Sequence, residues 1–313
     1  MLGLADAMVR CAATALLCGA AAHGFVGNDA QMWDTDGWPV SAHVPANDTP
    51  DELAALRVTC VGDSITIHAC ASNDSMPYPQ QLGRMLGPGY TVTNAGNSGK
   101  TMLKKGLCGD GGNCCGPSRE HPSPCVPPQS TTPCPECGGD CAYWDQDTYT
   151  MAMASRPDIV TIMLGTNDAK GCNWDYSPDG VQGRGDLFKD DYRAMIAAFQ
   201  ALPSRPTVLV VLPPPLFPPW PFNMSSHAIN VEFPALQRAV AAAANVSVVD
   251  IWTPLSEING LNATLGGQLA GAPLTCDGCH PKDAGLTILA ATIAEAVRAA
   301  GARRAQGGRA VAE

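Results

Sequence analysis

The stretch Arg57 to Thr66, with the sequence RVTCVGDSIT, decides the fold of this chain. Its first half is short and rich in Val and Thr, which is typical of a buried strand. The strand stops at Gly62-Asp63-Ser64, and a helical pattern follows over Pro77 to Leu86. A buried strand that turns into a helix is the first half of a parallel β-α-β unit.

The same alternation continues along the chain. Four further runs rich in Val, Ile, Leu and Thr predict buried strands over 90–94, 158–164, 207–212 and 246–251. Further helical patterns lie over 188–202, 229–244 and 283–300. Strands that alternate with helices imply right-handed crossovers, so we expect an open three-layer α/β/α sandwich with a five-stranded, mostly parallel sheet. Sites in such sheets lie at the carboxyl ends of the strands.

Length and composition fit one large α/β domain, predicted over 57–300. The 313 residues include 45% hydrophobic and 15% charged side chains, enough apolar material for a sizeable core. The 29 acidic and 19 basic side chains leave a net charge of −10, the wrong sign for binding phosphate backbones. We therefore expect no nucleic-acid partner. Residues 25–56 are predicted to be an N-terminal extension and 301–313 a flexible tail.

The N-terminus is typical of a secretory signal peptide over residues 1–24. Arg10 precedes the apolar run Cys11 to Ala22, which is too short to span a bilayer, and small residues follow it. A buried N-terminal helix is the alternative. Without Cys11 and Cys18, twelve of the fourteen cysteines remain, an even number suited to disulfides. N-x-[ST] sequons, which also suit secretion, begin at Asn47, Asn73, Asn223, Asn245 and Asn262. No later segment approaches the length of a membrane span, so we expect a secreted protein without stable membrane insertion.

Residues 107–141 interrupt the alternation of strands and helices. The segment is packed with Gly, Pro and seven cysteines and lacks apolar periodicity, which predicts a disulfide-stapled surface insertion. Cys134-x-x-Cys137 also has the spacing of zinc ligands, but a zinc ribbon needs a second matched pair. In an oxidising compartment we expect disulfides, and their connectivity stays open.

The turn after the first strand, Gly62-Asp63-Ser64-Ile65-Thr66, is a candidate nucleophile site. A serine between a buried strand and a helix lies where backbone N–H groups can stabilise an oxyanion. A simple helix N-cap is the alternative. The G-x-S-x-G elbow of α/β-hydrolases is absent from the sequence, which disfavours that family.

The second strand ends in Asn94-Ala95-Gly96-Asn97-Ser98-Gly99-Lys100-Thr101, one glycine short of a P-loop. The missing glycine, the expected secretion and the lack of an evident Mg²⁺ partner count against nucleotide binding. The alternative role is an oxyanion donor, for which the backbone N–H of Gly99 is the candidate.

Two later loops complete the set. The third strand runs into Gly165-Thr166-Asn167-Asp168, where the Asn167 amide is either an oxyanion donor or a turn residue. The last helix is preceded by Cys276-Asp277-Gly278-Cys279-His280-Pro281, in which Asp277 can reach the Nδ1–H of His280 and leave Nε2 free as a base. A helix cap beside a surface histidine is the alternative. A metal site is disfavoured because His280 and the two cysteines leave no obvious fourth ligand.

These four blocks, in this order, resemble the SGNH or GDSL hydrolase superfamily over about 57–300, apart from the insertion. The resemblance implies a flavodoxin-like sandwich and a catalytic triad of Ser64 as nucleophile, His280 as general base and acid, and Asp277 as the orienting carboxylate. It implies an oxyanion hole made by the backbone N–H groups of Ser64 and Gly99 and the Asn167 amide, with no metal and no organic cofactor. The expected reaction is two-step ester hydrolysis through an acyl-enzyme.

The sequence departs from the family pattern at the insertion and at the two cysteines that bracket Asp277. We expect a disulfide at Cys276 and Cys279 that stiffens the loop with the base; a strained, redox-gating bridge is the alternative.

The stretches around Tyr78, Lys100, Asn167 and Pro213 resemble the sialate O-acetylesterase-like branch, which removes acetyl groups from sugars. This implies a carbohydrate acetyl ester as substrate, with Trp174 and Trp220 as candidate stacking walls. A lysophospholipase or thioesterase with an acyl groove in the Pro213 to Phe222 loop is the second hypothesis. A catalytically silent, secreted carbohydrate-binding module is the third. The oligomeric state is not predicted.

Overall fold

The computed structural model describes residues 32–33, 39–40, 55–104, 106, 141–174, 184–218, 222, 224–258 and 274–312. The predicted signal peptide, most of the predicted extension and the cysteine-rich insertion up to residue 140 lie outside these ranges. An antiparallel pair, β1 (Met32–Trp33) with β2 (Pro39–Val40), is found within the extension.

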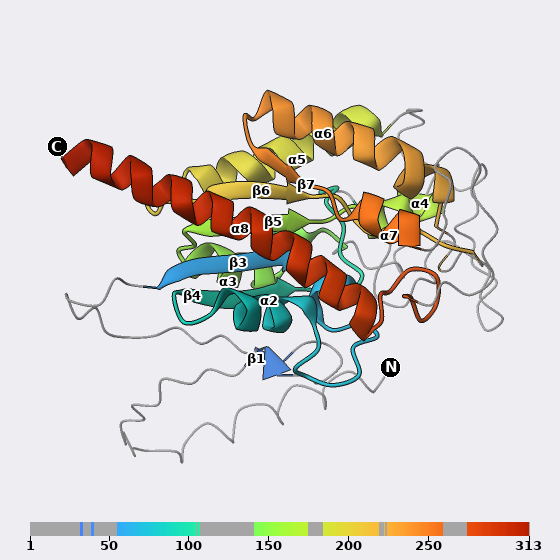
Figure 1. The fold of residues 1–313 in the computed structure, drawn as a ribbon. Helices are drawn as coiled ribbons and strands as arrows, with labels where there is room; N and C mark the ends of the chain where they lie inside the picture. The colour runs from blue at the N-terminus through green and yellow to red at the C-terminus, as the bar shows by residue number, and fades with distance from the viewer. Residues whose placement is uncertain are drawn as a thin grey trace, which may run out of the picture. The chain divides into compact units, whose positions relative to one another are not determined.

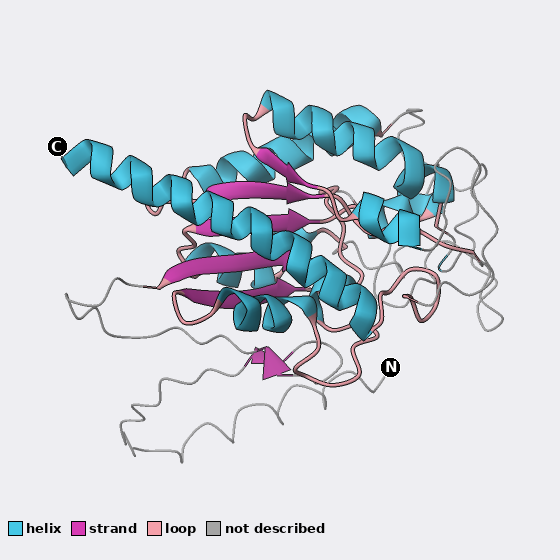
Figure 2. Cartoon of the chain, in the orientation of Figure 1, coloured by secondary structure: helices cyan, strands magenta, loops and turns pink. Residues whose placement is uncertain are grey.

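A five-stranded sheet forms the centre of the domain. Its strands are β3 (Leu56–Gly62), β4 (Tyr90–Gly96), β5 (Ile159–Met163), β6 (Thr207–Val211) and β7 (Ser247–Val249). Their spatial order is β4-β3-β5-β6-β7 and every pairing is parallel. The arrows in Figure 2 accordingly point the same way. The predicted five-stranded α/β/α sandwich is confirmed, and its flavodoxin-like strand order changes direction at β3.

Alternating side chains of the strands build two separate cores. Val58 and Cys60 of β3 belong to one buried cluster, whereas Val61 belongs to the other. In β5, Ile159 and Ile162 divide between the clusters in the same way. Both faces of every central strand are therefore covered, which explains the nearly continuous apolar runs in the sequence.

Helices cover both faces of the sheet. In Figure 1, α2 (Tyr78–Leu86) and α8 (Asp283–Ala312) lie in front of the sheet, and α3 (Asp147–Ala154) and α5 (Gly185–Gln200) lie behind it. The other helical elements are α1 (Ser64–Ile67), η1 (Tyr143–Asp145), η2 (Asn167–Ala169), α4 (Gly171–Trp174), η4 (Ala228–Glu232), α6 (Phe233–Ala243) and α7 (Trp252–Ile258). Neither α3 nor α7 was predicted, and only Thr148 and Ala152 of α3 are buried, which leaves little periodicity to detect.

Helix α8 is longer than predicted. The apolar pattern predicts a helix that ends at Ala300, followed by a flexible tail from Gly301. In the structure the helix continues to Ala312. Gly301 lies where the helix approaches β3 and β4, because an added Cβ would come within 2.8 Å of the Tyr90 hydroxyl and 3.0 Å of Leu56. The Arg304 guanidinium donates to the carbonyl of Arg205 at 2.8 Å. The glycine that suggested a helix end instead permits close packing.

By length and composition, Asp283–Gln306 of α8 could cross a membrane. The expectation that no later segment has the length of a span is therefore wrong. One face of this helix, including Leu286, Leu289, Ile293 and Val297, is buried in the core of the domain. This i, i+3, i+7 spacing is that of a helix packed against a sheet, which accounts for its hydropathy.

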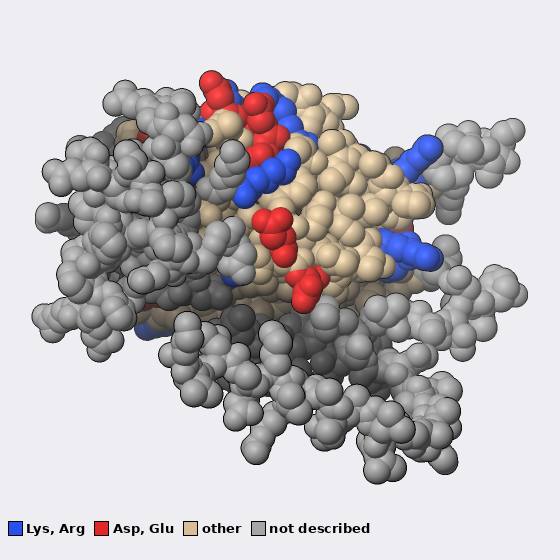
Figure 3. Space-filling model, turned by 180° about the vertical axis from the view of Figure 1, so that it is seen from behind, with Lys and Arg blue, Asp and Glu red and all other residues tan. Residues whose placement is uncertain are grey.

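Charged side chains of both signs are interspersed on the described surface. Helix α5 carries the ion pairs Asp186–Lys189 and Asp190–Arg193 at i, i+3 spacing. On the face turned away from α8, acidic and basic side chains lie close together (Figure 3). The visible charge on this face is therefore mixed rather than of one sign.

Two glycines at the carboxyl ends of β3 and β4 allow α1 to pack tightly against the sheet. A Cβ on Gly62 would lie 1.9 Å from Oγ1 of Thr66, and a Cβ on Gly96 would lie 2.3 Å from the backbone N of Ile67. The second contact is with backbone, so it cannot be relieved by rotating a side chain. The position of α1 therefore depends on Gly96.

We expect Gly96→Ala to lower the free energy of unfolding by about 1–3 kcal/mol, because the added methyl group overpacks the contact with α1. Gly89→Ala is the matched control, since nothing lies within 4 Å of a Cβ at that position. Chemical denaturation of both variants checks the prediction. Equal stabilities for the two variants would contradict it.

Candidate active site

Ser64 lies at the start of α1, directly after β3. Oδ1 of Asp63 accepts a hydrogen bond from the Ile65 N–H at 3.0 Å and so caps the helix. Ile65, Thr66 and Ile67 are buried behind Ser64, whose own exposure is 7%. The N-cap expected as an alternative role is thus performed by Asp63, and Ser64 is left at the first turn of the helix.

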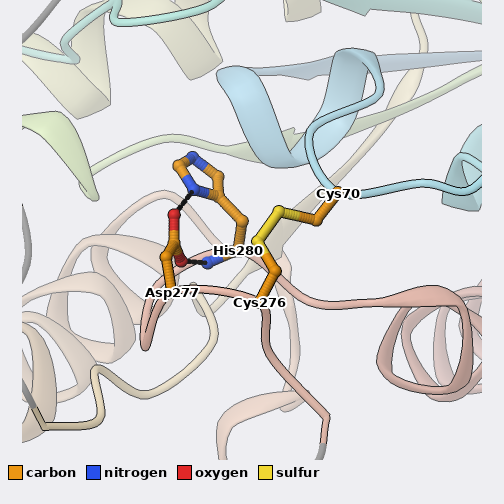
Figure 4. Close-up of side chains that lie close together, drawn as sticks. All are labelled: Cys70, Cys276, Asp277 and His280. Carbon is orange, nitrogen blue, oxygen red and sulfur yellow. Dashed lines mark hydrogen bonds and ion pairs between the residues drawn. A yellow bond between two sulfur atoms is a disulfide. The ribbon is translucent and has the colours of Figure 1, made fainter.

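His280 joins Ser64 to Asp277. Oγ of Ser64 lies 2.9 Å from Nε2 of His280, and Nδ1 of His280 lies 2.6 Å from Oδ2 of Asp277. The other carboxylate oxygen accepts the backbone N–H groups of Cys279 and His280, both at 2.8 Å. Figure 4 shows Asp277 engaging both the ring and the backbone of His280. With its proton on Nδ1, the imidazole presents an acceptor to the Ser64 hydroxyl.

Asp277 is held in its charged form. Burial by itself would raise the pKa of this carboxyl, but hydrogen bonds from the ring and backbone of His280 and from the Cys279 N–H outweigh that effect and lower the pKa. A carboxylate fixed by three donors keeps the imidazole in one orientation and stabilises it when it is protonated.

Gly99 and Asn167 come together beside this chain of hydrogen bonds. The side-chain amide of Asn167 donates to the carbonyl of Lys100 at 3.1 Å, which places η2 against the loop that follows β4. Gly99 has a φ of 76°, a conformation that favours glycine. Within the described part of the chain, no hydrogen bond engages the backbone N–H of Ser64 or Gly99. The three predicted oxyanion donors thus lie in the segments that follow β3, β4 and β5 at one edge of the sheet.

Two buried carboxyl groups lie beneath the site. Burial raises the pKa of Asp63 to about 6, against the lowering effects of the hydrogen bond from the Ile65 N–H and of electrostatic attraction to His280. Burial also raises the pKa of Asp168 to about 7, although its carboxylate accepts the N–H groups of Met102 and Leu103 at 2.9 and 2.8 Å. Asp168 thereby fastens the loop after β4 to the end of β5.

A disulfide joins the two segments that carry the site, but not between the expected cysteines. Cys276 is bonded to Cys70, in the loop after α1, and Cys279 is a buried free thiol. Sγ of Cys279 instead lies 4.0 Å from Sδ of Met224. The predicted bridge at Cys276 and Cys279 is therefore wrong, because tertiary packing brings a partner from 206 residues away. Figure 4 shows the bond linking the two loops.

A set of potential metal ligands that differs from Cys276, Cys279 and His280 comes together at the site. Donor atoms of Cys70, Cys276, Asp277 and His280 lie within 4.8 Å of one another. In the disulfide, however, neither sulfur is a thiolate, and both ring nitrogens of His280 already have partners. This oxidised donor set does not fit a metal ion.

Trp174 does not form the stacking wall that was expected of it. It is 9% exposed, packs against the rings of Phe188 and Phe233, and donates its indole N–H to Glu232 at 2.9 Å. It is a core residue with a satisfied polar atom. Trp220 lies outside the described residues.

Two residues that reach the site, Cys70 and Phe222, carry no role in the sequence motifs. Cys70 carried no spacing signal, because its partner is remote in sequence. Phe222 was noted only as the end of a Pro-rich loop, yet its ring centroid lies 5.6 Å from that of His280. The sequence signal that could have identified Phe222 is an aromatic residue in a loop after a strand. The same signal was used to predict stacking roles for Trp174 and Trp220.

We expect the buried carboxyls to make folding stability fall as the pH rises. The raised pKa values mean that the folded state binds these protons more tightly than the unfolded state, so the stabilisation is complete below about pH 4 and is lost as the pH rises through about 6 and 7. Asp168→Asn removes one of the two titrating carboxyls. The fall in the free energy of unfolding with rising pH should therefore be smaller in this variant, by on the order of several kcal/mol. Denaturation from about pH 4 to pH 8 tests this; a variant with the wild-type slope would rule it out.

We expect Cys276→Ser to lower the free energy of unfolding by up to about 5 kcal/mol under non-reducing conditions, because the bridge closes a very long loop. Cys70→Ser should have an equal effect, since it breaks the same bond. Cys279→Ser is the control and should cost about 1 kcal/mol, because it leaves the bridge intact. If Cys279→Ser were as destabilising as Cys276→Ser, the assigned pairing would be incorrect.

The chain is similar in sequence to known acylhydrolases and esterases. Residues 136–288 match the GDSL-like lipase/acylhydrolase family, a range that includes Asn167, Asp277 and His280. An acetylxylan esterase of Xylanibacter ruminicola is 28% identical over 289 residues, which cover 87% of this chain and 48% of that protein. The chain thus spans about half the length of the curated relative that it matches.

Solved structures share the fold. The acetyl xylan esterase AlAXEase superposes with a TM-score of 0.51 at 18% identity, covering 77% of this chain and 100% of that one. Est24, a carbohydrate acetylesterase from Sinorhizobium meliloti, has a TM-score of 0.50 at 22% identity, covering 78% of this chain and 99% of that one. Residues 136–288, just under half of the chain, thus match the GDSL-like lipase/acylhydrolase family, and the solved structures share its fold.

Proposed function

We propose that this protein is a serine esterase that removes acetyl groups from carbohydrate. The observation that carries the proposal is the chain of hydrogen bonds from Ser64 Oγ through His280 to Asp277, with distances of 2.9 and 2.6 Å. A hydroxyl joined to an imidazole that is oriented by a carboxylate is the arrangement that activates serine for acyl transfer.

The first half-reaction forms an acyl-enzyme. Nε2 of His280 accepts the Ser64 proton as Oγ attacks the ester carbonyl, and a tetrahedral oxyanion results. The backbone N–H groups of Ser64 and Gly99 and the side-chain amide of Asn167 donate hydrogen bonds to that oxyanion. His280 then gives its proton to the alcohol oxygen as the C–O bond breaks, so the alcohol leaves and the acetyl group stays on Ser64.

The second half-reaction repeats these steps with water. His280 removes a proton from the water as its oxygen attacks the acyl-enzyme, and the same donors hold the second oxyanion. Collapse breaks the bond to Ser64 Oγ, which regains its proton from His280, and acetate is released. Asp277 acts through His280 in both halves, because it holds the ring and stabilises the imidazolium.

Two lines of support favour an acetylated sugar as the substrate. The sequence blocks resemble a branch that deacetylates sugars, and the curated relative is named an acetylxylan esterase. The longer-chain lipase or thioesterase hypothesis depends on the loop from Pro213 to Phe222, of which the structure describes residues 213–218 and 222. The silent binding module is disfavoured because the candidate catalytic residues are in place.

We also propose that the protein is secreted. A disulfide between Cys70 and Cys276 requires an oxidising compartment, and Asn73 of one sequon is exposed. The apolar N-terminal segment supplies the expected signal, although it lies outside the described residues.

We expect the secreted protein to hydrolyse p-nitrophenyl acetate and to lose activity as the acyl chain lengthens, with Ser64→Ala reducing kcat at least 1000-fold because the nucleophile is removed. Ser72→Ala is the control, since Ser72 lies on an exposed loop, and its activity should equal that of the wild type. Rates with two-carbon to sixteen-carbon esters check the prediction.

Each other outcome of this experiment favours another hypothesis. A preference for long chains would favour the lipase or thioesterase. Full activity of Ser64→Ala would refute the nucleophile assignment. Silence at every chain length, combined with binding of xylo-oligosaccharides, would favour the binding module.

A further inference from the structure

We propose that Phe222 is the contact for the alcohol side of the ester, and hence a stacking surface for the sugar ring that carries the acetyl group. This inference rests on the proposed function. It adds the residue that contacts the alcohol part of the ester, which is the leaving group. Neither the family match nor the four sequence blocks assigns a role to Phe222.

The ring of Phe222 is exposed beside the reacting atoms. Its centroid lies 5.6 Å from that of the His280 imidazole, with an interplanar angle of 74°. The side chain is 41% exposed, whereas Trp174 is 9% exposed and Phe217 is 1% exposed. Among the described residues, the exposed large hydrophobic side chains are Leu187, Phe222 and Val231, and Phe222 is the aromatic one. An exposed aromatic ring against a catalytic imidazole is more readily explained by a ligand than by packing.

Residues on both sides of Phe222 contact the loop of His280, one through its backbone and one through its side chain. The Phe217 N–H donates to the carbonyl of Gly278 at 2.8 Å. Met224 forms a β-bridge with Lys170, and its sulfur lies 4.0 Å from Sγ of Cys279. Phe222 therefore lies between two anchored points of the chain, Phe217 and Met224.

Phe222 also adopts a backbone conformation that is unfavourable for its residue type. Its φ is 58°, in the left-handed region that is rarely occupied by large side chains. Such a conformation persists where the surrounding structure imposes it, and it is concentrated at functional sites. The strain and the exposure occur in the same residue, next to His280.

The mechanism determines which part of the substrate meets this ring. Nε2 of His280 must reach both Ser64 Oγ and the oxygen of the departing alcohol, so the alcohol lies beside the imidazole. The carbonyl oxygen points instead to the donors of Gly99 and Asn167. Phe222 contacts the imidazole, so it borders the alcohol and not the oxyanion.

An acetylated pyranose fits this surface chemically. The C–H groups on one face of a sugar ring form an apolar patch that packs on an aromatic face, while its hydroxyls remain in water. A small aliphatic alcohol such as methanol offers no such patch. Phe222 is therefore expected to distinguish sugar acetates from simple acetates.

The test compares two acetate esters that differ only in the alcohol. For Phe222→Ala, we expect kcat/KM to fall about tenfold further for an acetylated methyl xyloside than for methyl acetate, mainly through KM. Phe222→Tyr keeps the ring and should retain the wild-type ratio between the two substrates. Leu187→Ala removes another exposed hydrophobic side chain and should also retain this ratio.

The outcomes separate this inference from the proposed function. Equal losses on both esters would overturn it, because Phe222 would then only position His280. If Phe222→Ala is also assayed on the p-nitrophenyl ester series, a loss confined to longer acyl chains would overturn the inference in favour of an acyl wall. A wild-type ratio in Phe222→Ala would overturn it while leaving the esterase intact. A wild-type enzyme that cleaves neither ester would overturn the proposed function and this inference together.

Discussion

In the sheet, β3 lies between β4 and β5, and Gly62 pairs with Gly96 on one side and with Met163 on the other. This register brings the ends of three strands to one line, so the loops that follow them lie side by side. The chain crosses to the far side of β3 between β4 and β5, and open α/β sheets bind their ligands at such a change of direction. The positions of Ser64, Gly99 and Asn167 all follow from this parallel pairing.

The fourth loop reaches the same edge by different contacts. Nothing in the sheet pairing requires Asp277 and His280 to lie near Ser64, because they precede α8 rather than follow a strand. They are held by the disulfide from Cys276 to Cys70 and by the packing of α8 across the sheet. The acid–base residues of the site thus depend on a covalent bond and a helix face, whereas the oxyanion donors depend on strand register.

Buried polar groups connect these parts and give the site its rigidity. Asp63 caps α1, and Asp168 fastens the loop after β4 through two backbone N–H groups. Burying two carboxyl groups is unfavourable when both are charged, and the raised pKa values of Asp63 and Asp168 are the consequence. These buried carboxylates lower the free energy of unfolding near neutral pH. Their hydrogen bonds also fix the positions of the loops around Ser64.

The sequence by itself determined the alternation of strands and helices, the parallel sheet and the edge at which Ser64, Gly99 and Asn167 lie, because apolar periodicity and strand-end motifs are local signals. Tertiary structure alone decided three other features. Cys70 pairs with Cys276 across 206 residues, Trp174 is buried while Phe222 is exposed, and Gly301 lies within a helix. Disulfide partners, exposure of loop aromatics and close approaches of glycine depend on which distant segments come into contact, and no local pattern encodes that.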